Sequence, residues 1–174
     1  MIPFGDPSAS YQAHKSQIDQ AIKRVLDSGW YVLGTEVEAF EKEFASFHGK
    51  DLHAVGVANG TDAIALCLRG LGLGTGDEVI TPSHTAVATV AGIEQAGCTA
   101  VFADIDPTTR CISPNSIMEN LCGNTRAIMP VHIYGQPAKM HRILEIAQAY
   151  NLAVVEDCSQ AHGAEIDGRK VGTF

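Results

Sequence analysis

Residues 152–164, LAVVEDCSQAHGA, join a short apolar run to a cluster of polar and ionisable side chains. The first four residues have the length and β-branched content of an interior parallel strand, and Glu156 and Asp157 follow directly. In open α/β sheets, ligands bind at the carboxyl ends of the strands. A carboxylate there is costly to desolvate unless a cation or hydrogen-bond donors meet it. The stretch therefore predicts an interior strand of an α/β sheet, with Asp157 in need of a partner.

The chain from residue 51 onward repeats this rhythm of short apolar strand, loop and helix. We expect strands over residues 54–58, 78–81, 99–103, 127–131 and 152–155, and helices over 63–69, 85–96, 113–122 and 138–150. Such alternation predicts a parallel sheet with right-handed crossovers and helices on both faces, an αβα sandwich. Beyond the last strand, Asp167-Gly168 predicts a two-residue hairpin turn.

The first fifty residues have a helical pattern instead. Apolar residues recur at three- and four-residue spacing over residues 11–28, and Gly29 is placed to end that helix. Thr35 and Glu38 fit a capping box for a second helix, which Gly49 ends. We therefore expect an amino-terminal helical segment, residues 1–50, followed by an αβ sandwich, residues 51–174.

Composition narrows the class of protein. The 174 residues are 45% hydrophobic, which is typical of one ordinary globular core, and no run approaches the roughly 20 apolar residues of a membrane-spanning helix. The amino terminus, MIPFGDPSAS, has no signal-peptide pattern, so we expect a cytoplasmic protein that does not bind membranes. A net charge of −8 argues against a nucleic-acid partner. The five cysteines form no Cys-x-x-Cys pair and are interpreted as buried free thiols.

Two glycine-containing stretches could approach a phosphate. The run over residues 70–76 matches neither phosphate-loop pattern and follows a helix, so we interpret it as a helix stop and a link. The turn Asn59-Gly60-Thr61 precedes a helix, where Gly60 lets the backbone approach a ligand and exposed amides favour a phosphate. A plain helix cap by Thr61 or Asp62 explains this turn equally well.

Nucleophile and metal chemistry fit the sequence less well. Cys158 or Ser159 would struggle to converge with His162 from within one strand-end segment, and there is no G-x-S-x-G turn. His84, His132 and His162 lack the paired spacing of a metal site. Each is interpreted as a hydrogen-bonded structural histidine, and no metal is expected.

Five stretches together resemble one family, the DegT/DnrJ/StrS sugar aminotransferases, which are pyridoxal-phosphate enzymes. They are GTEVEAFE (34–41), ANGTDA (58–63), DEVITP (77–82), PVHIYGQ (130–136) and VEDCSQAHGA (155–164), and they cover nearly the whole chain in order. The resemblance implies part of the large domain of an aspartate-aminotransferase-like, fold-type I enzyme.

The resemblance also implies roles for single residues. Asp157 would pair with the protonated pyridine nitrogen of pyridoxal 5′-phosphate, keeping the ring able to accept electrons from the substrate. Gln160 would contact the phenolic oxygen side of the ring, and Gly60 and Thr61 would hold the phosphate. An amino acid, L-glutamate, would donate the amine to a nucleotide-linked keto sugar, and the full-length protein would be a homodimer.

Two departures from the family pattern matter. Many relatives carry an aromatic residue that stacks on the pyridine ring within the stretch 82–89, where this chain has Ala86, and His84 is a neighbouring candidate for that contact. The family's Schiff-base lysine belongs to a segment beyond residue 174, and no lysine present matches its motif, so no catalytic lysine is assigned. We expect residues 1–174 to be an incomplete cofactor-binding large domain without the small domain, which makes activity of this chain alone doubtful.

Two other functions stay open. Some relatives replace the lysine with histidine and act as sugar dehydratases with the same cofactor. The same strand ends could also serve a non-catalytic α/β module that binds a ligand or a partner.

Overall fold

The computed structural model describes residues 5–174, which divide into two compact units with the boundary between Gly56 and Val57. The first unit holds α1 (Pro7–Ser28) and α2 (Thr35–His48), neither of which has a buried residue. Helix α1 begins earlier than predicted because the Asp6 side chain accepts a hydrogen bond from the Ala9 amide. It ends at Gly29, as predicted, in a left-handed conformation.

The predicted capping box is wrong. Gly34 is the N-cap residue of α2 and Thr35 is already helical, so its side chain makes no cap hydrogen bond. Its neighbour Glu36 forms an ion pair with Arg24 of α1, with 2.6 Å between Oε1 and Nε. The first turn of α2 thus faces α1 through a charge pair, rather than closing on itself.

The second unit is built on the parallel sheet that the sequence predicted. Its strands are β1 (Glu78–Pro82), β2 (Thr99–Ala103), β3 (Thr125–Ile128) and β4 (Ala153–Val154), in the spatial order β2-β1-β3-β4. Its helices are α3 (Gly60–Gly70), α4 (Val87–Ala96), α5 (Pro114–Glu119) and α6 (Met140–Tyr150), with a short 3-10 turn η1 (Ile133–Gly135) after β3. All strands therefore end at one edge of the sheet, which is where the polar segments lie.

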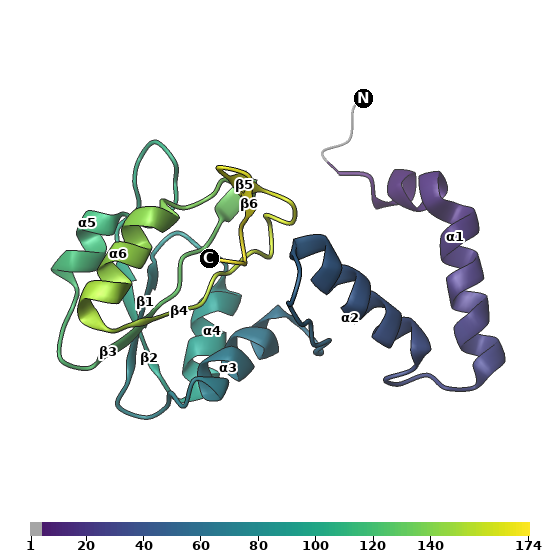
Figure 1. The fold of residues 1–174 in the computed structure, drawn as a ribbon, viewed down its shortest axis with the longest axis horizontal. Coiled ribbons are helices and arrows are strands. Elements are labelled where there is room, and N and C mark those ends of the chain that lie inside the picture. The colour runs from purple at the N-terminus through teal and green to yellow at the C-terminus, as the bar shows by residue number, and fades with distance from the viewer. Residues whose placement is uncertain (1–4) are drawn as a thin grey trace. The chain divides into compact units, whose positions relative to one another are not determined.

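Two apolar cores cover the two faces of this sheet. Ile80 and Ile128 pack with residues of α5 and α6, such as Ile117 and Ile143. The alternate strand residues, including Val79, pack instead with α3 and α4. Figure 1 shows α5 and α6 together on one side of the strands and α3 beside α4. The αβα sandwich is thus confirmed.

One predicted strand does not form. Residues 54–58 pair with no strand in the described part of the chain, and Val55 and Val57 are 80% and 40% exposed. Their β-branched pattern favours an extended chain, but a strand also needs a neighbour to receive its hydrogen bonds.

The link after α3 and the hairpin form where the sequence predicted them. Residues after α3 form a link in which Gly72 and Gly76 have positive φ. The predicted hairpin is β5 (Glu165–Ile166) with β6 (Arg169–Lys170), and both turn residues have positive φ, as a type I′ turn requires. Of the five thiols, Cys98 and Cys111 are buried, whereas Cys67 and Cys122 are exposed, so the expectation of buried thiols was wrong for those two.

The helices of residues 5–174 include none that is both long and apolar enough to cross a membrane.

Candidate functional site

The carboxyl ends of β3 and β4 stay paired beyond the strands themselves. A parallel bridge joins Val131 to Asp157, in which the Asp157 amide donates to Pro130 O at 2.9 Å and the His132 amide donates to Asp157 O at 3.0 Å. The Asp157 backbone is therefore fixed on both sides, and its side chain is set by the rigid sheet rather than by a loop.

The half-buried Asp157 carboxylate accepts hydrogen bonds from neutral donors. Oδ1 accepts from the Ser159 amide at 3.1 Å and from the Ser159 hydroxyl at 2.6 Å, and Oδ2 accepts from the Thr89 hydroxyl at 3.3 Å. A carboxylate has about four lone-pair sites for acceptance. These three bonds therefore orient the group and leave capacity for one further donor.

A second hydroxyl supports this arrangement from α4. Thr89 is buried in the first turn of the helix, and its Oγ1 lies 2.8 Å from Thr85 Oγ1. A hydroxyl has one proton to donate, so donation from Thr89 to Asp157 requires that Thr85 donate to Thr89. The two threonines thus form a directed chain that ends at Asp157.

Gln160 lies in the same strand-end segment and is held by the turn after β3. Its Oε1 accepts from the Tyr134 amide at 2.8 Å. The Tyr134 hydroxyl in turn lies 3.1 Å from His84 Nε2, and the two rings are tilted with centroids 5.8 Å apart. The structure thus brings Asp157, Gln160 and His84 to one edge of the sheet, and the ring nearest to His84 is that of Tyr134.

The start of α3 lies near the same segment. A Cβ added to Gly60 would be 3.9 Å from Ser159 Oγ, so the glycine faces the residue that holds Asp157. The N-cap is Asn59, whose side chain accepts from the Asp62 amide at 2.9 Å, so a cap by Thr61 or Asp62 is wrong. In the described part of the chain the Thr61 hydroxyl makes no hydrogen bond, and the first helical amides have no intrahelical partner.

Close packing fixes α3 against α4. A Cβ on Gly92 of α4 would meet Ile64 at 2.7 Å and the Thr61 carbonyl at 2.8 Å, so only glycine permits this contact. The start of α3 and Thr89 of α4 are therefore held in one rigid frame.

Ala86 is the N-cap residue of α4, and it is exposed at the sheet edge that carries the other predicted residues. The sequence resemblance expects an aromatic ring in this stretch, which a methyl group cannot supply.

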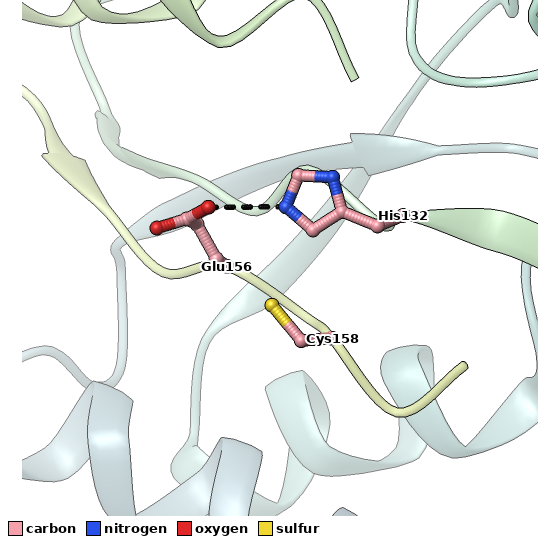
Figure 2. Close-up of side chains that lie close together, drawn as sticks. All are labelled: His132, Glu156 and Cys158. Atoms are coloured by element: carbon pink, nitrogen blue, oxygen red, sulfur yellow. Dashed lines mark hydrogen bonds and ion pairs between the residues drawn. The ribbon is translucent and has the colours of Figure 1, made fainter. Parts of the chain in front are cut away.

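The neighbouring carboxylate, Glu156, belongs to a separate buried cluster with His132 and Cys158 (Figure 2). The His132 ring is 0% exposed and its Nε2 lies 3.1 Å from Glu156 Oε2. The ring's other nitrogen, Nδ1, accepts from the Ala138 amide at 2.9 Å. Since Nδ1 is the acceptor, the neutral ring carries its proton on Nε2 and donates it to Glu156.

The ligand-type atoms of these three residues all lie within 4.8 Å of one another, a grouping that could in principle hold a metal ion. Their lone pairs are committed elsewhere, however. Glu156 also accepts from the Gly172 amide at 2.9 Å and the Phe174 amide at 2.8 Å. Burial, and then the charges of Glu156 and Asp157, raise the pKa of the Cys158 thiol to about 12. We therefore interpret the cluster as a hydrogen-bonded support, in which His132 is buried and hydrogen-bonded.

Sequence reasoning missed three residues of this site: Thr89, Ser159 as a donor to Asp157, and Tyr134. Thr89 and Tyr134 do lie in the stretches 82–89 and 130–136 that carry the family resemblance. Ser159 stands two residues after the carboxylate that it binds, which is the spacing of a local side-chain turn.

Comparisons with known proteins find relatives that cover the whole chain. Residues 12–174 match the DegT/DnrJ/EryC1/StrS aminotransferase family. The chain is 47% identical over 174 residues to the dTDP-3-amino-3,6-dideoxy-alpha-D-galactopyranose transaminase of Aneurinibacillus thermoaerophilus, covering 100% of this chain and 48% of that protein. The chain thus spans about half the length of the curated relatives that it matches.

Solved structures of this kind of enzyme have the same fold as this chain. The crystal structure of S. venezuelae DesV, in complex with a ketimine intermediate, superposes with a TM-score of 0.96 at 46% identity, over 99% of this chain and 46% of that one. A GDP-4-keto-6-deoxymannose-3-dehydratase with a trapped PLP-glutamate geminal diamine superposes with a TM-score of 0.82 at 32% identity, over 89% and 42% of the two chains. The fold is thus the α/β fold of part of a fold-type I pyridoxal-phosphate enzyme. On its sequence and its fold, this chain belongs to the DegT/DnrJ/EryC1/StrS aminotransferase family.

Proposed function

We propose that this chain forms the part of a pyridoxal-phosphate sugar aminotransferase that binds the pyridine ring and the phosphate, with a nucleotide-linked keto sugar as amino acceptor. The carrying observation is the Asp157 carboxylate, which three neutral donors orient and which retains capacity for a fourth. A protonated pyridine nitrogen is a fitting fourth donor, because it supplies the positive charge that the three present donors lack.

Pyridoxal phosphate, when bound, supplies an electron sink for bonds broken at the substrate's amine-bearing carbon. Asp157 would hold the proton on the ring nitrogen, and Thr89 and Ser159 would orient the carboxylate by donating to it. Gln160 would bind the phenolic side of the ring. Gly60 and Thr61 would bind the phosphate, through free amides at the start of α3 and the unpaired Thr61 hydroxyl.

A bound pyridine ring would also need an apolar or aromatic contact from the stretch that includes Ala86. We propose that His84, braced by the Tyr134 ring, contributes it. L-Glutamate as amino donor, a homodimer and a cytoplasmic location complete the proposal.

An aminotransferase is favoured over a sugar dehydratase by the degree of similarity. The relatives that are 46–47% identical carry transaminase names, whereas the dehydratase structure is 32% identical. Incubation of the longest natural protein that contains this chain with a keto sugar and glutamate separates the two, since only transamination forms 2-oxoglutarate in proportion to amino sugar.

The cofactor site itself is tested by titrating the chain with pyridoxamine 5′-phosphate and following its absorbance. This form has the same ring and phosphate but no aldehyde, so it cannot attach to surface lysines. We expect Asp157→Asn to weaken binding roughly tenfold or more, because a hydrogen bond to a charged group contributes about 1.5–3 kcal/mol.

Asp104→Asn is the matched control. Asp104 directly follows β2 at the same edge of the sheet and is exposed, so its loss of charge should leave the affinity within about twofold. Absence of binding by the unmodified chain, or equal binding by the two variants, would favour a non-catalytic module and refute the proposal.

A further inference from the structure

The turn that follows β3 fixes the orientation of the Gln160 side-chain amide. Its Oε1 lies 2.8 Å from the Tyr134 backbone nitrogen. A backbone N–H can only donate, so the atom facing it must be the carbonyl oxygen of the amide and not its nitrogen. The NH₂ group of Gln160 is therefore held on the other side, as a donor.

The Tyr134 backbone has an unusual conformation, which points its N–H toward the Gln160 side chain. Its φ and ψ are 57° and 21°, in the left-handed region that non-glycine residues rarely adopt, and Gly135 follows with φ 79°. A Cβ on Gly135 would lie 3.4 Å from the main-chain carbonyl oxygen of Gln160. The two residues thus curve closely around Gln160, touching both its main chain and its side chain.

The local sequence alone does not explain why a tyrosine occupies this position. Asparagine or glycine would adopt the conformation at lower cost. The Tyr134 side chain is exposed, and His84 is the only ring that it contacts in the described residues. The strained conformation occurs together with the hydrogen bond from the Tyr134 amide to Gln160, and backbone strain of this kind clusters at functional sites.

We infer that the Tyr134 backbone amide is a positioning group, which holds Gln160 so that Nε2 donates to an anionic oxygen of a bound aromatic ligand. The inference rests on the proposed function, under which that oxygen is the phenolic oxygen of the cofactor. A donor at this place stabilises the ionised phenol, whereas a reversed amide would present its oxygen and repel it. The orientation of one amide thus sets the protonation state of the ring oxygen.

Gln160→Glu tests the orientation directly. The carboxylate still accepts from the Tyr134 amide, but it replaces the donor with a negatively charged oxygen. We expect at least a tenfold loss of affinity for pyridoxamine 5′-phosphate, and a rise in the pH at which the absorbance of the bound ligand reports ionisation of its phenol. Gln136→Glu, which adds the same charge at an exposed glutamine of the neighbouring turn, should change neither quantity.

Substitutions of Tyr134 separate the backbone from the side chain. Tyr134→Gly keeps the N–H and relaxes the left-handed backbone, so the phenol ionisation should stay as in the unmodified chain. Tyr134→Val also keeps an N–H, but a β-branched residue resists this conformation, so the turn should move and the ionisation should shift toward higher pH. Equal shifts in the two variants would assign the effect to the tyrosine ring and overturn the inference.

Hydrogen exchange tests the contact without any ligand. The Tyr134 amide should be protected in the unmodified chain and in Gln160→Glu, and unprotected in Gln160→Ala. If the Tyr134 amide exchanges equally fast in the unmodified chain and in Gln160→Ala, the positioning role is refuted whatever binds. If pyridoxamine 5′-phosphate binds and its affinity falls in Asp157→Asn but not in Gln160→Glu, the inference fails and the proposed function stands. If the unmodified chain does not bind the ligand, the proposed function fails, and the ligand assigned to Gln160 fails with it.

Discussion

Two adjacent carboxylates at the end of β4 have opposite surroundings. The Glu156 side chain is 6% exposed and accepts from the His132 ring and from the amides of Gly172 and Phe174. Asp157 is half-buried and accepts from the hydroxyls of Ser159 and Thr89 and from the Ser159 amide. Successive residues of an extended chain point to opposite faces, so one backbone segment serves both environments.

This difference separates a carboxylate that stabilises the fold, Glu156, from one that can accept a further hydrogen bond, Asp157. The donors to Glu156 are two main-chain amides and a buried ring, and they come from distant parts of the chain, so they cannot reorient without moving the backbone. The donors to Asp157 are largely side-chain hydroxyls that can turn to suit a new partner. Glu156 therefore joins the segment after β6 to the sheet. Asp157, at the edge of the sheet, can still accept a hydrogen bond from a further donor.

The largest expected effect is on stability, and it should separate the two residues. Glu156→Gln puts an NH₂ group opposite a backbone N–H, leaving a buried donor unpaired, so the free energy of unfolding should fall by about 2 kcal/mol. In Asp157→Asn the oxygen can keep both Ser159 bonds and the NH₂ can donate to Thr89, so the loss should stay within about 0.5 kcal/mol. Urea unfolding followed by circular dichroism measures both. Equal losses would show that Asp157 is as structural as its neighbour.

The sequence alone predicted the edge of the sheet at which these carboxylates lie, but not their partners. An apolar run followed by polar residues marks a strand end, so β4 and Asp157 were found from residues 152–164. The prediction of an interior strand was wrong for the described residues, because β4 is half-buried and lies at one end of the strand order. Thr89 lies 68 positions from Asp157 and the Gly172 amide lies 16 positions from Glu156, and no local pattern encodes contacts at such separations. The left-handed Tyr134 was also hidden, because tyrosine does not favour that conformation.

The failed predictions have the same cause. Thr35 and Glu38 have the spacing of a capping box, yet Glu36 pairs with Arg24 of another helix and the cap falls on Gly34. Residues 54–58 have strand composition but lack a neighbouring strand in the described residues. Local patterns give propensity, and the partner that satisfies the hydrogen bonds decides the outcome.

A smaller effect is expected from the support of Asp157. Thr89→Val keeps the shape of this buried side chain and removes the hydroxyl, so the carboxylate loses one donor and some of its orientation. We expect the affinity for pyridoxamine 5′-phosphate to fall about fivefold, in line with about 1 kcal/mol for one hydrogen bond. Thr89→Ser retains the hydroxyl and is the matched control. An unchanged affinity in Thr89→Val would mean that Ser159 alone orients Asp157.

The smallest effect concerns Cys158, which directly follows the two carboxylates in the sequence and whose thiol pKa is raised by both of their charges. Burial raises the pKa of its thiol to about 12 from the ordinary value of 9.0, with Glu156 a larger electrostatic cause than Asp157. The folded chain thus binds the thiol proton more tightly than the unfolded chain does. The resulting stabilisation is complete below pH 9 and is lost as the pH rises toward 12.

Alkylation of Cys158 should accordingly be much slower than that of the exposed Cys67 at pH 8, where the thiolate is the reactive form. Glu156→Gln should lower the midpoint of the alkylation pH profile more than Asp157→Asn does, by less than about one pH unit, since burial remains. The midpoint is the deciding quantity because local opening in a destabilised variant raises the rate at every pH without moving it. A larger shift in Asp157→Asn would reverse the comparison, because the half-buried carboxylate would then affect the thiol more strongly than the buried one does.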